Sequence, residues 1–137
     1  MIKSEDLRLG DIVKVKTVSG EVKVCIVQSL MLGALGATVK EINNDNNGYT
    51  MSVSAIPLTL ELLEKNGFKE EQHQKDHASE WYDFYHYDLG INVLYEVAKK
   101  GISFAAYLEG KKLREIKYVH ELQHILWALG LNAELYV

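Results

Sequence analysis

The residues best suited to chemistry lie near the carboxyl end of the sequence, where positions 120–124 read HELQH. This pentapeptide matches the H-E-x-x-H pattern of zinc metallopeptidases. On a helix, residues four apart share a face, so the imidazoles of His120 and His124 would lie one above the other and ligate Zn²⁺. Glu121 would then take a proton from a zinc-bound water. The pattern therefore raises the hypothesis of a zinc-dependent hydrolase.

A catalytic zinc also requires a third protein ligand, and the sequence does not supply an obvious one. Neither the second acidic helix of thermolysin-like enzymes nor the third histidine of the metzincins follows His124. His86 or Glu134 would have to serve, and the spacing of neither residue requires it. We therefore expect no resident cofactor or metal, and zinc held by His120 and His124 remains the alternative.

The same segment is explained without a metal as an amphipathic helix over residues 117–129, ended by Gly130. Its polar side carries His120, Gln123 and His124, which we expect to be solvated. Trp127 lies close to these histidines, and exposed aromatic rings of this kind are typical of contact surfaces. The helix thus predicts a binding surface rather than a catalytic site. Its apolar stripe comprises Tyr118, Val119, Leu122, Ile125, Leu126 and Leu129.

A second concentration of functional side chains is the aromatic segment 80–88, EWYDFYHYD. In a strand, alternation would place Trp81 and Tyr85 on one face and Tyr82 and Phe84 on the other. We expect one face to pack on a helix and the other to be covered or to contact a partner. Trp81 and Tyr85 therefore join His120, His124 and Trp127 in the predicted binding surface.

Charge and cysteine content limit the classes of function. The net charge is −4 and the pI about 5.7, which disfavours duplex nucleic acid, because such binding depends on clustered Lys and Arg. A nucleic-acid module using Lys14, Lys16 and Lys23 is kept as an alternative. The single cysteine, Cys25, excludes an intramolecular disulfide, and its apolar surroundings predict a buried thiol.

The first ten residues resemble no signal peptide, and no apolar run is long enough to cross a bilayer. We therefore expect a cytoplasmic protein without a membrane partner.

The fold predicted from these patterns is α+β. Residues 1–56 are expected to form an SH3-like β-barrel of four strands, opened by LRLGDIV, with a turn at NNDNNG. Residues 57–137 are expected to form a helix capped by Thr59, an antiparallel β-meander packed on the C-terminal helix, and a short last strand, AELYV. The polar run KEEQHQKDHASE, residues 69–80, is expected to be an exposed loop.

Three blocks, LRLGDIV, IPLTLELLEKNGF and IKYVHELQHILWALG, resemble a family of small uncharacterised proteins encoded in phages and mobile elements of gut anaerobic bacteria. In that family the last block usually reads Y-V-H-Q-L-Q-N-L. Glu121 therefore stands where the family shows Gln, and His124 where it shows Asn. The resemblance implies a helix whose common role is packing, and it implies no activity.

Together these observations predict a non-catalytic binding or adaptor protein of phage or mobile-element origin, which contacts a protein partner. Two alternatives stay open: a zinc-dependent hydrolase that uses the HELQH motif, and a nucleic-acid-binding module that uses the N-terminal barrel.

Overall fold

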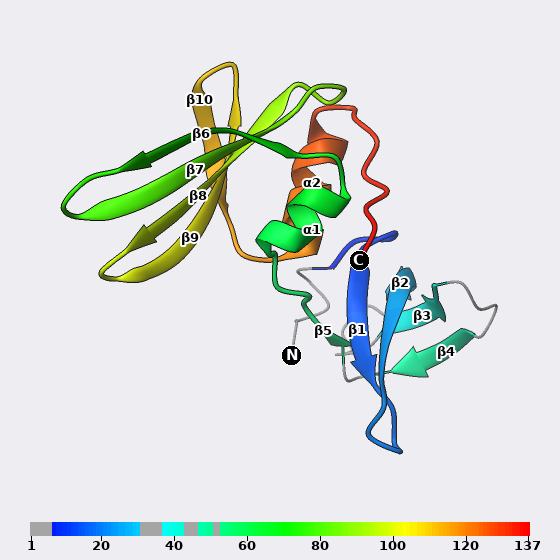
Figure 1. Ribbon diagram of the computed structural model, residues 1–137. Helices are drawn as coiled ribbons and strands as arrows, with labels where there is room; N and C mark the ends of the chain where they lie inside the picture. Colours follow the sequence, from blue (N-terminus) through cyan, green and yellow to red (C-terminus); the bar gives the residue numbers. More distant parts are fainter. Residues whose placement is uncertain (1–6, 31–36, 43–46, 51–52) are drawn as a thin grey trace. The chain divides into compact units, whose positions relative to one another are not determined.

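The computed structural model describes residues 7–30, 37–42, 47–50 and 53–137. The chain forms two compact units, residues 1–57 with 118–123, and residues 58–117 with 124–137 (Figure 1). The prediction placed the whole C-terminal helix in a domain spanning residues 57–137, whereas the structure groups residues 118–123 with the first unit. Most of the predicted NNDNNG turn, positions 43–46, lies outside the described residues.

The first unit contains one antiparallel five-stranded sheet with the strand order β4-β3-β2-β1-β5. The first three predicted strands are confirmed. The fourth predicted strand is divided in two, and its second part, β5, returns to pair with β1, where Val53 lies opposite Val15. The strands are β1 (Ile12–Lys16), β2 (Val22–Leu30), β3 (Ala37–Glu41), β4 (Asn47–Thr50) and β5 (Val53–Ser54).

Alternation along these strands places aliphatic side chains in one buried cluster. Cys25 belongs to it as predicted, and burial raises the pKa of its thiol. Each fully buried Val or Leu contributes about 1.5–3 kcal/mol by leaving water. A bulge in β2 between Val27 and Ser29 bends that strand. The cluster comprises Leu7, Val13, Val15, Cys25, Val27, Val39 and Val53.

The second unit begins with α1 (Leu60–Lys65), which follows its predicted signals. The backbone N–H of Leu62 donates to Thr59 Oγ1 at 3.2 Å, so Thr59 is the N-cap as expected. The helix ends at Asn66, and Gly67 has a φ of +88°. A Cβ at Gly67 would lie 2.9 Å from His86 Nε2, so this turn requires glycine for both its backbone conformation and its space.

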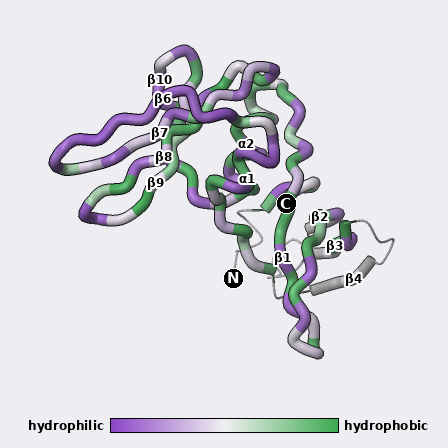
Figure 2. The backbone as a smooth tube through the Cα atoms, in the orientation of Figure 1, coloured by the Kyte–Doolittle hydropathy of each residue, from purple (hydrophilic) through white to green (hydrophobic). Residues whose placement is uncertain are grey.

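A five-stranded antiparallel meander follows, with the order β10-β9-β8-β7-β6. The four predicted strands are confirmed, but the loop predicted for residues 69–80 is wrong because most of it forms β6. Every residue of β6 is exposed and the strand is largely hydrophilic (Figure 2), so it carries no apolar alternation. The strands are β6 (Lys69–Lys75), β7 (Ser79–His86), β8 (Ile91–Ala98), β9 (Gly101–Leu108) and β10 (Lys111–Ile116).

The predicted C-terminal helix is confirmed as α2 (Val119–Ala128). The predicted last strand, residues 133–137, is wrong, because these residues form no strand. Instead, the amide of Asn66 holds this tail: the backbone N–H of Tyr136 donates to Asn66 Oδ1 at 2.6 Å, and Asn66 Nδ2 donates to the carbonyl oxygen of Tyr136 at 2.7 Å. No helix in the described ranges is long and apolar enough to span a membrane.

Candidate binding groove

The HELQH segment lies on α2, but its polar side chains are not a solvated face. His120 is 6% exposed and Gln123 is 1% exposed, so the prediction that both face solvent is wrong. Glu121 and His124 are half-buried. The helix is therefore covered on more than its apolar stripe, and the reason is visible in the hydrogen bonds of Gln123.

The side-chain amide of Gln123 takes the place of a strand beside β1. The backbone N–H of Ile12 donates to Gln123 Oε1 at 2.8 Å, and Gln123 Nε2 donates to the carbonyl oxygen of Gly10 at 3.2 Å. β5 pairs with β1 only at Lys14 and Val15, so it does not reach these groups. Buried backbone groups need partners, and Gln123 supplies them.

Glu121 also has a structural role. Its Oε1 accepts a hydrogen bond from the backbone N–H of Tyr118 at 3.1 Å, and its own N–H donates to the carbonyl oxygen of Tyr118 at 3.1 Å. Tyr118 immediately precedes α2, and a carboxylate that reaches back to the backbone N–H of this position is half of a capping box. Its negative charge also lies near the positive end of the helix dipole, which is favourable. The proposed catalytic base is therefore engaged in capping α2.

The donor set for a metal is incomplete in the part of the chain that the structure describes. No three His, Cys, Asp or Glu side chains gather there in a way that could hold a metal ion. Of the third ligands that the sequence offered, His86 accepts the backbone N–H of Leu89 at 3.1 Å and packs edge-on against Phe68, while Glu134 is exposed.

The binding surface predicted on α2 is only partly accessible. The ring of His124 stacks on that of Trp127, with a centroid separation of 5.7 Å, and both residues are half-buried. The ring of His120 stacks on Tyr118 at 5.8 Å and is buried. His124 and Trp127 therefore remain candidates for contact with a partner, whereas His120 contributes almost no exposed surface.

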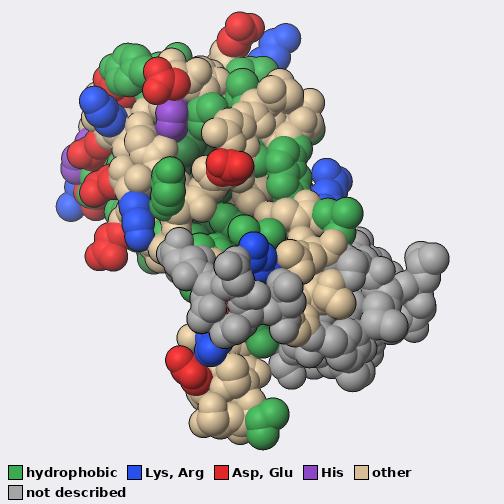
Figure 3. All heavy atoms as spheres, turned by 90° about the vertical axis from the view of Figure 1, so that its right-hand side faces the viewer, with side chains coloured by type: hydrophobic (Ala, Val, Ile, Leu, Met, Phe, Trp, Pro, Cys, Tyr) green, Lys and Arg blue, Asp and Glu red, His purple; other side chains and the backbone are tan. Residues whose placement is uncertain are grey.

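The three lysines of the nucleic-acid alternative do not form one stripe. Lys14 and Lys16 share a face of β1, but Lys23 lies opposite Val15 and so belongs to the other face. Lys23 pairs with Glu41 at 3.2 Å, and this hydrogen bond and charge raise its pKa. On the face shown in Figure 3, Lys and Arg side chains are interspersed with Asp and Glu rather than gathered together.

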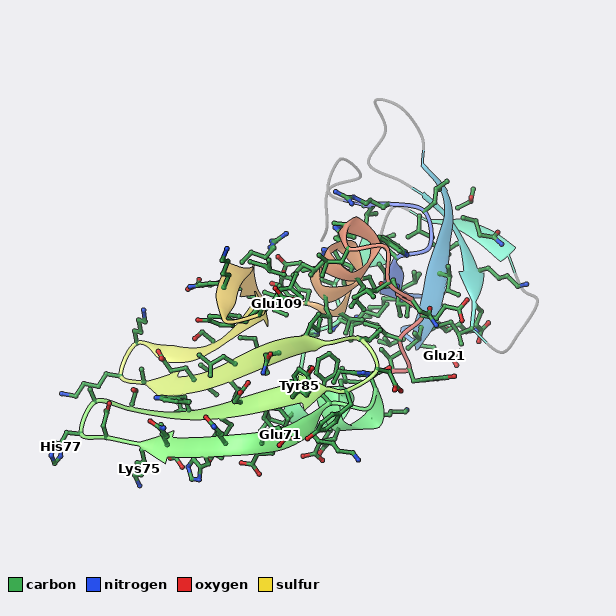
Figure 4. The ribbon with its side chains drawn as sticks, turned by 90° about the horizontal axis from the view of Figure 1, so that it is seen from above. Glu21, Glu71, Lys75, His77, Tyr85 and Glu109 are labelled. Atoms are coloured by element: carbon green, nitrogen blue, oxygen red, sulfur yellow. The ribbon has the colours of Figure 1, made fainter. Side chains whose placement is uncertain are left out.

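The two faces of the second sheet differ in burial. On β7, Phe84 is 2% exposed and belongs to the inner face, together with Val93, which lies directly opposite it on β8. Trp81, Asp83 and Tyr85 alternate with Phe84 and occupy the outer face, where all three are half-buried. Figure 4 shows β6 to β9 side by side, with side chains projecting from both faces and Tyr85 labelled. The expectation that aromatic rings occupy both faces of this strand is confirmed.

A groove with a volume of about 400 Å³ opens on the outer face of this sheet. Four of its lining residues come from the neighbouring strands β7 and β8, and the other three come from β6, β9 and the β9–β10 turn. Its lining residues are Gln72, Trp81, Asp83, Asn92, Leu94, Tyr107 and Gly110.

Both edge strands of this sheet are irregular. The register of β6 against β7 shifts between Glu70 and Gln72, and that of β10 against β9 shifts between Lys112 and Arg114. Bulges bend a strand and increase its twist, and in Figure 1 β10 (gold) is turned steeply from the direction of β7 and β8.

The polar centre of the groove is the carboxylate of Asp83. Asn92 Nδ2 donates to both of its oxygens, at 3.0 and 3.2 Å. Leu94 lies directly opposite Asp83 on β8, and Gln72 lies opposite it on β6. Among the described residues, no ion pair involves Asp83. The groove therefore presents an oriented acceptor without a cation, between aromatic and aliphatic side chains.

Sequence reasoning found only part of this site. Trp81 lines the groove, whereas Tyr85 is not among the lining residues and its ring meets Tyr87 edge-on at 4.9 Å. Asp83 could have been added, because strand alternation places it on the face of Trp81. Asn92 and Tyr107 could not, because their position depends on the register of β8 and β9, in which Asn92 lies opposite Tyr107.

A second polar and aromatic cluster lies on the opposite face of the sheet. Glu80 Oε1 is within hydrogen-bond distance of Tyr82 Oη (2.7 Å) and His73 Nε2 (2.6 Å), and the His73 ring stacks on Tyr82 at 4.2 Å. The hydrogen bond from Tyr82, followed by that from His73, lowers the pKa of Glu80. The same bond raises the pKa of Tyr82. His73 is exposed, whereas Glu80 and Tyr82 are half-buried, and the cluster ties β6 to β7.

The groove thus combines an open volume, two aromatic rings and a carboxylate that forms no ion pair with the residues that the structure describes. The amide of Gln123 and the carboxylate of Glu121 on α2, by contrast, bond to the backbone. Function is inferred from this geometry alone, since in comparisons with known proteins the chain matches no family model, no curated protein and no solved structure.

Proposed function

We propose that the protein is a non-catalytic binding protein that holds a segment of a protein partner in the groove of its second sheet. The observation that carries this proposal is the groove itself, whose lining includes the rings of Trp81 and Tyr107 and the carboxylate of Asp83. Trp and Tyr are enriched among residues that dominate binding energy. A volume of about 400 Å³ accommodates a few side chains of a partner.

The first unit supports the proposal of an SH3-like architecture. Its strand order, β4-β3-β2-β1-β5, brings the last strand back beside the first, and its apolar residues form one cluster. Small barrels of this kind are built from short, bent strands around such a core. A phage or mobile-element origin is proposed from the sequence resemblance alone.

The two alternatives raised by the sequence gain no support from the site geometry. Zinc hydrolysis would require Glu121 as a base, but this side chain caps α2. Nucleic-acid binding would require a basic stripe, but Lys14 and Lys23 lie on different faces. A protein partner agrees better with the aromatic and acidic character of the groove.

The proposal is tested by selecting random linear peptides on the full-length protein and measuring their affinity by fluorescence anisotropy. Trp81→Ala and Tyr107→Ala are each expected to raise the Kd of selected peptides at least about tenfold, as expected for central aromatic contacts. Tyr136→Ala, which removes a 71% exposed ring in the C-terminal tail, is the control and should leave the Kd unchanged.

Two results would refute the groove as the binding site. The first is the absence of any peptide whose affinity depends on Trp81 or Tyr107. The second is a set of peptides whose affinity is lost in Trp127→Ala but kept in Trp81→Ala, because binding would then occur on α2. Circular dichroism of each variant checks that it is folded.

A further inference from the structure

We infer that the groove recognises an arginine side chain of the partner segment, an inference that rests on the proposed binding function. The guanidinium would stack on the indole of Trp81 and donate its N–H groups to Asp83. Three observations lead to this assignment: the state of the carboxylate, the position of the aromatic rings and the charge of the outer face.

The carboxylate of Asp83 is oriented but not neutralised. Asn92 donates to both oxygens, which fixes the plane of the group and leaves each oxygen able to accept another hydrogen bond. No ion pair of the described residues involves it. Asp83 is half-buried, and charges interact more strongly where water is partly excluded, so an incoming cation would gain more here than at an exposed carboxylate.

The aromatic residues lie where a planar cation needs them. Trp81 and Asp83 are two residues apart on β7 and face the same side, which separates their Cα atoms by about 6.5–7 Å. A guanidinium placed over the indole can therefore direct its N–H groups toward the carboxylate. Arginine combines stacking and paired hydrogen bonds in one rigid group, whereas the ammonium of lysine is more strongly hydrated.

The surrounding charge favours a cation over a neutral or acidic ligand. Glu96 lies directly opposite Trp81 on β8 and is half-buried, so the indole has carboxylates both along its own strand and across from it. Gln72, opposite Asp83 on β6, adds no charge. The whole chain carries a net charge of −4. Lys112, which lies opposite Tyr107 on β10, is paired with Glu115 at 3.3 Å. The part of the groove around Trp81 and Asp83 is therefore complementary to a basic segment.

The first test uses peptides that bind in a Trp81-dependent manner and compares each arginine with citrulline, its neutral near-isostere. Replacing the critical arginine by citrulline is expected to raise the Kd at least about tenfold, because the charge and the paired hydrogen bonds weaken together. Replacing it by lysine is expected to have a smaller effect, since the charge remains. The binding should also weaken as salt concentration rises.

The second test changes the protein. Asp83→Asn is expected to raise the Kd of the arginine peptide at least about tenfold and to abolish its preference over the citrulline peptide. Asp88→Asn removes an equal charge from the exposed β7–β8 turn and should leave both unchanged. Gln72→Arg, at an exposed position opposite Asp83, should weaken peptide binding, because the new guanidinium can itself pair with Asp83. Gln28→Arg, at an exposed position of β2, should not.

The outcomes separate this inference from the proposed function. If peptides bind through Trp81 but citrulline replaces arginine without loss, the arginine assignment is overturned and the protein-binding proposal stands. If no peptide binds through Trp81, both fail. If instead a panel of neutral oligosaccharides binds and Trp81→Ala abolishes that binding, the partner is a carbohydrate, which also overturns both.

Discussion

The α2 helix and the groove of the second sheet both carry polar side chains suited to binding or catalysis, but these side chains have different partners in the fold. On α2, Gln123 bonds to the backbone of β1 and Glu121 caps the helix. In the groove, Asp83 is hydrogen-bonded to Asn92 and faces an open volume. The helix matches a known catalytic motif, and the groove matches none.

This difference shows that a short motif says less about function than the partners that its residues have in the fold. Within HELQH, the side chains of Gln123 and Glu121 form hydrogen bonds with backbone groups. Pairing buried backbone groups is a requirement of folding. In the groove, by contrast, Asn92 donates to the side chain of Asp83 and not to a backbone group. We therefore expect substitutions on α2 to change stability and substitutions in the groove to change binding.

The largest effect on stability is expected for Gln123→Ala. The change leaves the buried N–H of Ile12 without its acceptor, and such a loss costs about 1–3 kcal/mol of unfolding free energy. Gln28→Ala, at an exposed position of β2, should change stability by less than about 0.5 kcal/mol. Urea denaturation of both variants measures the difference, and equal midpoints would show that the buried amide stabilises nothing.

A smaller loss is expected for Glu121→Ala. Removing the carboxylate that bonds to Tyr118 should cost about 0.5–2 kcal/mol, in the range of other helix caps. Glu121→Gln should retain most of the stability, because Gln can also complete a capping box. Thermal unfolding of the two variants provides the measurement.

Metal analysis sharpens the interpretation of α2. Protein purified without a histidine tag and dialysed is expected to hold no stoichiometric zinc by elemental analysis. Stoichiometric zinc that is lost in His124→Ala, together with hydrolytic activity lost in Glu121→Gln, would contradict the structural roles assigned to this helix. The functional site would then lie on α2 and not in the groove.

Asp83→Asn is expected to have a still smaller effect on stability. The variant keeps the shape of the side chain and one acceptor for Asn92, so the unfolding free energy should fall by about 1 kcal/mol or less. Its effect on peptide affinity, at least about tenfold, should be large by contrast. Parallel urea titration and anisotropy measurements test this separation, and a loss of stability equal to that of Gln123→Ala would refute it.

The smallest effect concerns pH and the Glu80 cluster. The folded-state pKa of Glu80 is lowered, mainly by the hydrogen bond from Tyr82. Its contribution to stability is therefore present above the ordinary value of 4.5 and is lost as the pH falls through the folded pKa. Tyr82→Phe should raise the pKa of Glu80 and weaken this dependence. Carbon-13 NMR of the carboxyl group measures the titration, and an unchanged midpoint would exclude Tyr82 as the cause.

The elements with regular apolar signals were predictable from the sequence. Val and Ile alternate with Lys in β1, Thr59 precedes a Leu-rich turn, and Gly130 follows α2. These are local signals, and the structure confirms the corresponding strands and helices. The antiparallel meander was also predictable, because turn signals separate its strands.

What was not predictable depends on long-range pairing. β6 has no apolar face, and its order comes from its hydrogen bonds to β7. The burial of Gln123 depends on backbone groups more than a hundred residues away, and the place of Tyr107 in the groove depends on strand register.

The bonds from Gln123 to Gly10 and Ile12 have a consequence for biosynthesis. The first unit is discontinuous along the chain, because residues 58–117 separate its two parts. A nascent chain that has emerged only as far as Pro57 lacks the side-chain amide of Gln123, which bonds to the backbone of Gly10 and Ile12. The edge of β1 beside Gly10 and Ile12 can therefore be completed only after residue 123 has been translated, and the second unit is completed later still, because it includes residues 124–137.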